Sequence, residues 1–186
     1  MKYVDPDGRK LTLTVDKASQ TMNVKLSLKV GNVTFNANEN VKVTTHVVAD
    51  SDKTQSNKKA NENLNPQKRN TNGSAWTQFP NGEWKITGSK DGPNQNVDGT
   101  VDGQLTTNAH QLLKKRDSEG NIISKNGNDV LVDDWGYNIH YTENSNTAGC
   151  IGVKSKGAMS FIMFLFKLNE KYDPGTSIIK VTGKEE

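Results

Sequence analysis

The sequence predicts a mainly β fold with one helix near the C-terminus. Apolar and polar residues alternate through much of residues 11–48, which is the period of strands with one face buried and the other in water. Residues 157–171 are the one stretch in which apolar residues recur at helical spacing. Because hydrophobic residues make up only 32% of the chain, it can bury one modest core but cannot fill two large ones.

An antiparallel β segment is expected over residues 10–50. Its apolar positions are rich in β-branched side chains, which suit a pleated, half-buried surface. Gly and Asn favour turns, so turns are expected at residues 31–32 and 36–40. The strands of this segment are expected at residues 11–15, 24–30, 33–35 and 41–43.

A polar loop or linker is expected over residues 51–74, which have almost no apolar residue besides Leu64. Its lysines are not interleaved with aromatic residues, so they indicate a solvated segment rather than a nucleic-acid surface. The core resumes in residues 75–186. Strands are expected there at residues 84–87, 130–132, 137–141 and 177–181, a strand or short helix at 112–113, and the end of the helix at 173–175.

The composition argues against several classes of function. Lys and Arg number 24 and Asp and Glu 21, and the formal net charge of +3 is too balanced to indicate a nucleic-acid partner. Cys150 is the single cysteine, so no intramolecular disulfide is expected, and no Cys/His cluster suggests a metal or other cofactor. The longest apolar run, residues 161–166, is far shorter than the ~20 residues of a membrane span. The N-terminus has no apolar signal-peptide region.

Residues 3–9 (Tyr-Val-Asp-Pro-Asp-Gly-Arg) form a turn signal that stands apart from the strands. These seven residues also resemble the closing motif of the Rhs repeat-associated core, which in long secreted proteins precedes a variable toxin domain. The resemblance implies that residues 1–9 end such a core. The rest of the chain would be the payload, secreted or delivered to the periplasm or cell wall of a target cell. An ordinary N-terminal turn is the alternative.

The stretch that points to chemistry runs from His140, at the end of an expected strand, to Cys150 ten residues later. The polar loop between them can return the chain so that the imidazole meets the thiol. A thiolate is a nucleophile, and a nearby His lowers the thiol pKa and then moves protons. Gly149 lets the backbone approach a substrate closely and leaves amide N–H groups for an oxyanion. The alternative is a buried structural Cys150 and a His140 that makes a routine hydrogen bond.

The same residues resemble the L,D-transpeptidase catalytic domain, whose signature is a His, a spacer, and then Ser/Thr-any-Gly-Cys. Residues 139–140 (Ile-His) and 147–151 (Thr-Ala-Gly-Cys-Ile) carry this signature, with Thr147 in place of the usual Ser. Residues 80–86 (Pro-Asn-Gly-Glu-Trp-Lys-Ile) resemble an upstream strand of that family. The match covers roughly residues 76–183 and is most similar to the compact, short-spacer members used as antibacterial effectors. It implies a β-sandwich or open barrel with one C-terminal helix.

The resemblance implies a cysteine enzyme that acts on peptidoglycan stem peptides. Cys150 would attack a stem-peptide carbonyl, His140 would act as base and then as acid, and amides near Gly149 and Cys150 would bind the oxyanion. The acyl-enzyme would pass to water in a carboxypeptidase or to an amine in a transpeptidase. If the toxin context also holds, a cognate immunity protein is an expected partner.

This chain departs from the family pattern at two positions. Tyr141 stands where the family has Gly after the His, and Gly152 stands where it has Arg two residues after the Cys. The missing Arg puts the transpeptidase branch in doubt. Trp135, Tyr137 and Tyr141 form either an aromatic wall for a ligand or part of the core. The residues expected to bind substrate are Tyr141, Thr147, Trp135 and Asn138.

Two other classes of function compete with the enzyme. One is a non-catalytic wall-binding or adhesion β module in which Cys150 is inert. The other is a different toxin chemistry such as a nuclease, suggested only by the weakly basic charge. Thiol reactivity separates the enzyme from the module, because an activated thiolate reacts fast near neutral pH and a buried structural cysteine does not.

Overall fold

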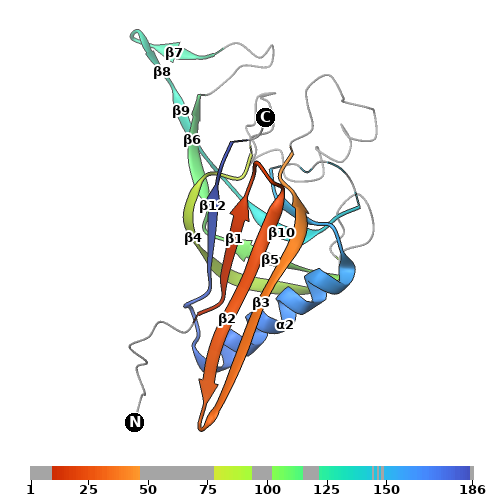
Figure 1. Ribbon diagram of the computed structural model, residues 1–186. Helices are drawn as coiled ribbons and strands as arrows, with labels where there is room; N and C mark the ends of the chain where they lie inside the picture. The colour runs from red at the N-terminus through yellow and green to blue at the C-terminus, as the bar shows by residue number, and fades with distance from the viewer. Residues whose placement is uncertain are drawn as a thin grey trace.

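Eight strands form a closed barrel in the order β1-β12-β4-β5-β10-β11-β3-β2 (Figure 1). The computed structural model describes residues 10–46, 78–93, 102–114, 122–143, 145, 147 and 149–184. The barrel strands are β1 (Thr12–Asp16), β2 (Thr21–Val30), β3 (Val33–Thr44), β4 (Gly82–Pro93), β5 (Asp102–Thr107), β10 (Asn138–Tyr141), β11 (Ile151–Val153) and β12 (Ile178–Thr182). The expected mainly β architecture is confirmed, and the barrel is closed rather than open.

The barrel closes because β1 pairs in parallel with β12, in register from Thr12 opposite Ile178 to Asp16 opposite Thr182. On its other edge β1 pairs with β2, and β3 reaches β11 through Val43 and Thr44. Strands of the expected N-terminal segment are thus joined on both sides to strands from residues 82–182. The two parts of the chain therefore form one barrel rather than two separate folded units.

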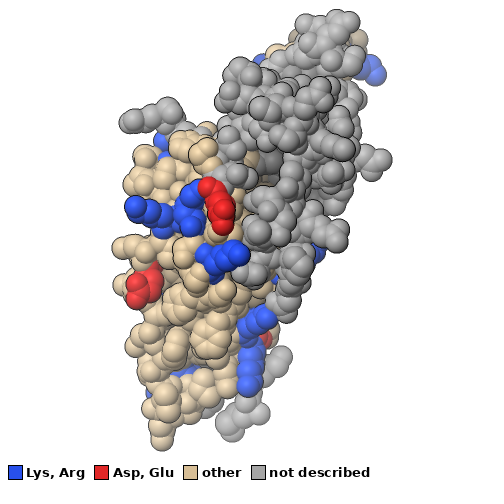
Figure 2. Space-filling view, turned by 90° about the vertical axis from the view of Figure 1, so that its right-hand side faces the viewer, with Lys and Arg blue, Asp and Glu red and all other residues tan. Residues whose placement is uncertain are grey.

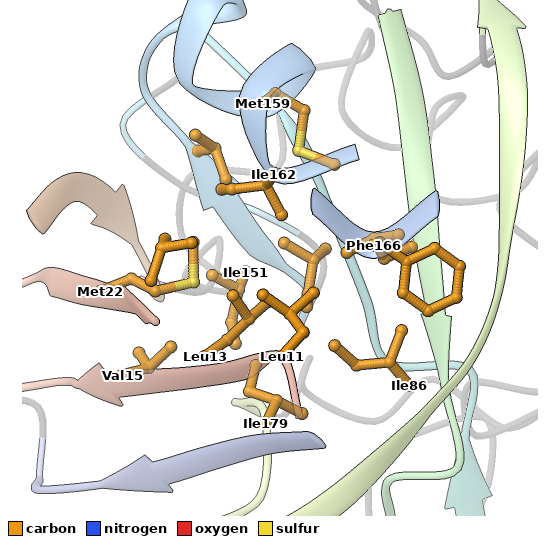
Figure 3. Packing of buried hydrophobic residues seen from close by; sticks show 14 of the residues in the cluster. Leu11, Leu13, Val15, Met22, Ile86, Ile151, Met159, Ile162, Phe166 and Ile179 are labelled. Carbon is orange, nitrogen blue, oxygen red and sulfur yellow. The ribbon is translucent and has the colours of Figure 1, made fainter. Parts of the chain in front are cut away.

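A single hydrophobic core fills the barrel and the space under the helix α2 (Lys156–Tyr172). Leu11, Leu13 and Val15, which alternate along the start of the chain, are all 0% exposed. The helix crosses behind β2 and β3 in Figure 1 and lies against β2, β5, β10 and β11. Its inward side chains Met159, Ile162 and Phe166 face the apolar side chains of the strands (Figure 3). The helix observed matches the one expected over residues 157–171, and it is the one helix in the described part of the chain.

The C-terminal end of α2 is tied to two barrel strands through the fully buried Asn169. Its Oδ1 accepts a hydrogen bond from the Leu11 N–H at 3.2 Å, next to the start of β1. Its Nδ2 lies 3.0 Å from the hydroxyls of Thr176 and Ser177, just before β12. This one amide therefore fixes α2 to the strand pair that closes the barrel.

The long hairpin of β2 and β3 corrects one expectation, because residues 36–40 belong to β3 and pair with residues 23–27 of β2. On the solvent face the Asn23 amide donates to the side-chain oxygens of Asn38 and Asn40, both at 2.9 Å. The asparagines satisfy each other across the strands, so their usual preference for turns is overridden by pairing. The turn expected at residues 31–32 is present, with Gly31 at φ 59°.

Outside the barrel, β6 (His110–Lys114) pairs with β9 (Leu131–Trp135), and β7 (Ser124–Lys125) pairs with β8 (Asn128–Asp129). Residues 112–113 are therefore a strand, one of the two structures expected for them. The turn motif at residues 3–9 and the polar loop at residues 51–74 lie outside the described residues. Among the described helices, none is long and apolar enough to cross a membrane.

Candidate active site

Strand pairing brings the segments that carry His140 and Cys150 side by side. β10 and β11 are neighbouring parallel strands, with Ile139 opposite Ile151 and His140 opposite Gly152. Cys150 immediately precedes β11, and residues 142–150 form the connection from one strand to the other. Because His140 is opposite Gly152, Cys150 lies in the neighbouring segment, two residues along the chain from the partner of His140.

The alternation of side chains places His140 on the outer face of β10, and Cys150 lies directly before the neighbouring strand β11. Ile139, Ile151 and Val153 are 0% exposed and point into the core. His140 is half-buried and occupies the other face of β10, opposite Gly152. Cys150 lies two residues before Gly152, directly before β11, and is also half-buried.

The ring of His140 is oriented by a backbone carbonyl. Its Nδ1 lies 2.8 Å from the carbonyl oxygen of Tyr141. A carbonyl oxygen can only accept, so Nδ1 carries the proton, and in the neutral ring the lone pair is on Nε2. A backbone carbonyl in this position can orient an imidazole, which is the third role expected beside a nucleophile and a base.

The connection between the two strands is held by hydrogen bonds on the side of β3. The Thr44 hydroxyl donates to the Ser145 carbonyl at 2.6 Å, and the Thr147 N–H donates to the His46 carbonyl at 2.7 Å. Within the loop, the Thr147 hydroxyl donates to the Cys150 carbonyl at 2.6 Å. Thr147 is only 6% exposed, so its hydroxyl supports the loop. The loop thus leaves β10, reaches across to β3 and returns to β11.

Side chains pack closely around Gly152. A Cβ added at Gly152 would lie 2.9 Å from Cγ2 of Thr44 and 3.0 Å from Cγ2 of Thr147, and Cγ2 of Thr142 would be closer still. Methyl groups of these three threonines fill the space that a side chain at residue 152 would need. Gly149 is also required by its backbone, because its φ of 92° is one that other residues rarely adopt.

The expected substrate-binding residues fall in different environments. Asn138 is half-buried on the face of β10 that carries His140. Tyr141 is 5% exposed and belongs to the core, with its hydroxyl donating to Oε1 of Glu143 at 2.5 Å. Tyr137 is also buried, with its ring 5.5 Å from that of Phe79. The two tyrosines therefore take the core role, one of the two roles that the sequence left open. The backbone of Trp135 ends β9 opposite His110.

Two residues beside the site could not be predicted from the sequence around them. Gln104 of β5 is the register partner of His140 and is only 6% exposed, although it is polar. Thr44 of β3 is the register partner of Gly152 and is 3% exposed. Both reach the site through strand pairs that join distant parts of the chain, and β5 itself has only Leu105 as a large apolar residue.

Positive side chains lie beside the first part of the loop. The Lys154 ammonium donates to the Glu143 carbonyl at 2.7 Å, and the Lys156 ammonium lies 5.6 Å from the centre of the Tyr141 ring. The face turned to the viewer in Figure 2 shows basic and acidic side chains of the described residues in small separate groups. No continuous basic stripe crosses that part of the surface.

Comparison with protein-family models, curated proteins and solved structures gives no match to this chain. In the described part of the chain, no group of three or more His, Cys, Asp or Glu side chains is placed to hold a metal ion. The function of the chain is therefore inferred from its own residues and their geometry.

Proposed function

We propose that this protein is a peptidoglycan-directed cysteine enzyme that works through an acyl-enzyme on Cys150. The proposal is supported by the pairing of β10, which carries His140 on its outer face, with β11, which begins directly after Cys150, and by the contact of the His140 ring with the Tyr141 carbonyl. A half-buried thiol in the segment next to an oriented imidazole fits a nucleophile better than a fully buried structural cysteine would.

The chemistry follows from the tautomer of His140. Nε2 takes the proton from the Cys150 thiol, and Sγ attacks the carbonyl carbon of a stem-peptide bond. Backbone amides near Gly149 and Cys150 stabilise the oxyanion. The imidazolium then gives its proton to the leaving amine as the C–N bond breaks, which leaves a thioester. Water or a second amine, deprotonated by His140, attacks the thioester and regenerates the thiol.

The substrate class rests on the resemblance of residues 139–151 and 80–86 to L,D-transpeptidases. The lysines at positions 154 and 156 support it, because stem peptides carry carboxylates. The packing of threonine methyl groups against Gly152 leaves no room for the Arg of the family, which favours release of the acyl group to water. We therefore assign the carboxypeptidase branch as the main reaction.

The biological setting is proposed from residues 3–9 alone. Their resemblance to the Rhs closing motif supports an antibacterial toxin that is carried by a larger secreted protein to the target-cell periplasm. In that setting a cognate immunity protein would protect the producing cell.

Digestion of purified peptidoglycan tests this function. Wild type and the Cys150→Ala variant are incubated with the same sacculi, and the muropeptides are analysed by mass spectrometry. The expected result is shortened stem peptides, without an exchanged residue, from the wild type only. Equal product from both proteins would exclude the cysteine mechanism, and no product from either would favour a binding module.

A further inference from the structure

We propose that Thr44, at the end of β3, is a positioning residue that holds the Cys150 loop in its reactive geometry. The inference rests on the proposed function, because it assigns Thr44 a role toward the nucleophile. Thr44 belongs to the N-terminal strands, which lie far from Cys150 in the sequence and outside the part that resembles L,D-transpeptidases.

The Thr44 side chain makes two separate contacts. Its hydroxyl donates to the Ser145 carbonyl at 2.6 Å, and its methyl group lies against Gly152, 2.9 Å from where a Cβ would be. Thr44 is 3% exposed, so its side of this partly buried hydrogen bond is shielded from water. The hydroxyl therefore holds the loop, while the methyl fills the space over the strand.

A short path of bonds leads from β3 to the nucleophile. The Thr147 N–H donates to the His46 carbonyl at 2.7 Å, and the Thr147 hydroxyl donates to the Cys150 carbonyl at 2.6 Å. The Thr44–Ser145 and Thr147–His46 bonds attach the middle of the loop to the end of β3 and to the residue shortly after it. The Thr147–Cys150 bond attaches the end of the loop to its middle. Without the Thr44 hydroxyl, the loop loses this partly buried hydrogen bond to β3, and we expect the loop to shift.

A small shift of this loop is expected to lower the reactivity of the Cys150 thiol, because a displacement of about 1 Å near reacting groups can cost on the order of 100-fold in rate. As Sγ moves from His140, the thiolate loses its stabilising partner and the thiol pKa rises toward the ordinary value of about 8.5. The proposal therefore predicts a change in the pH profile of Cys150, which a purely structural role of Thr44 would not produce.

The experiment measures alkylation of the full chain by iodoacetamide as a function of pH. Cys150 is the single cysteine, so the rate reports on this thiol alone. Two comparisons measure the effect of the Thr44 hydroxyl on this rate. The wild type is compared with Thr44→Val, and Thr44→Ser is compared with Thr44→Ala. The matched control is Thr182→Val on β12, which removes the hydrogen bond from the Thr182 hydroxyl to the Val15 carbonyl of β1, away from β10 and β11. Thermal unfolding of each variant identifies those that fold.

The wild type, Thr44→Ser and Thr182→Val are expected to share a lowered thiol pKa. Thr44→Val and Thr44→Ala are expected to show a higher pKa and alkylation near neutral pH slower by about tenfold. If Thr44→Val does not fold, the comparison of Thr44→Ser with Thr44→Ala still tests the role of the hydroxyl. The role of Thr44 would be overturned if the wild type showed a lowered thiol pKa and each variant without the hydroxyl had the same pH profile of alkylation as its partner with the hydroxyl. The proposed function would still stand in that case. An ordinary cysteine profile in the wild type would remove the proposed function, and the role of Thr44 with it.

Discussion

At the residue scale, His140 is the group whose geometry is most directly tied to chemistry. Its Nδ1 bond to the Tyr141 carbonyl fixes the tautomer and the ring plane. We expect His140→Ala to lower kcat/KM on stem peptides by about 10²–10⁴-fold, because both activation of the thiol and proton delivery are lost. Steady-state assay of released amino acid measures this change.

The matched control is His110→Ala, whose imidazole lies on β6 with its ring centre 5.4 Å from that of Trp84. This variant is expected to keep the wild-type rate. An unchanged rate in His140→Ala, or an equal loss in both variants, would argue against a base at residue 140.

Gly152 gives the second prediction at this scale. Gly152→Ala places a methyl group against Thr44, Thr142 and Thr147, all in buried positions. Overpacking of this kind costs about 1–3 kcal/mol, so we expect a lower free energy of unfolding together with slower alkylation of Cys150. Denaturant unfolding and thiol kinetics measure the two effects.

Gly157→Ala is the control for Gly152, because its added Cβ has only Ser155 Oγ nearby, at 3.8 Å. Ala is a better helix former than Gly, so this variant is expected to be as stable as the wild type or more so. If both substitutions were tolerated equally, the tight packing over residue 152 would be refuted.

At the scale of elements, Asn169 connects α2 to β1 and to the start of β12. Asn169→Ala leaves the Leu11 N–H and the Ser177 hydroxyl without this buried partner. Each unsatisfied buried group costs about 1–3 kcal/mol, so a loss of at least about 2 kcal/mol in unfolding free energy is expected. Urea unfolding provides the measurement.

Asn23→Ala is the comparison for Asn169, since it removes two exposed amide contacts on the β2–β3 hairpin. Water replaces those partners, so its loss of stability is expected to be much smaller. If Asn23→Ala lowered the free energy of unfolding as much as Asn169→Ala, burial of the hydrogen bonds would not be what determines their contribution to stability.

The elements that the sequence predicted well are those with strong periodicity. The helix at residues 157–171 and the alternating strands at 11–15 and 24–30 were expected from side-chain spacing alone. The expected turn at 36–40 was wrong and β5 was not expected, because asparagine pairing and strand register depend on distant partners. Thr44 and Gln104 were not expected for the same reason, since they reach the site only through strand pairs with distant segments. His140 and Cys150 are ten residues apart in the sequence, and their action as a pair stays a prediction.

At the scale of the whole molecule, the N-terminal strands complete the barrel and reach the candidate site. β1 covers one edge of β12, and β3 covers one edge of β11. We expect a fragment of residues 75–186 alone to lack a cooperative unfolding transition, because removal of β1–β3 opens the barrel and leaves these edges without their partners.

Calorimetry and near-UV circular dichroism of this fragment, beside the full chain and a variant that begins at residue 10, measure the effect. The variant that begins at residue 10 retains every described strand and is expected to unfold cooperatively. A cooperative transition of the 75–186 fragment would instead establish an independent C-terminal domain.

The central claim is that Cys150 forms the covalent intermediate, and intact-protein mass spectrometry with a stem tetrapeptide tests it most directly. The acyl-enzyme is trapped by rapid acid quench, and peptide mapping locates the added group. The wild type should gain one acyl group on Cys150, with loss of the terminal amino acid of the substrate, and Cys150→Ala should gain none. An adduct on another residue, or turnover by Cys150→Ala, would contradict the claim.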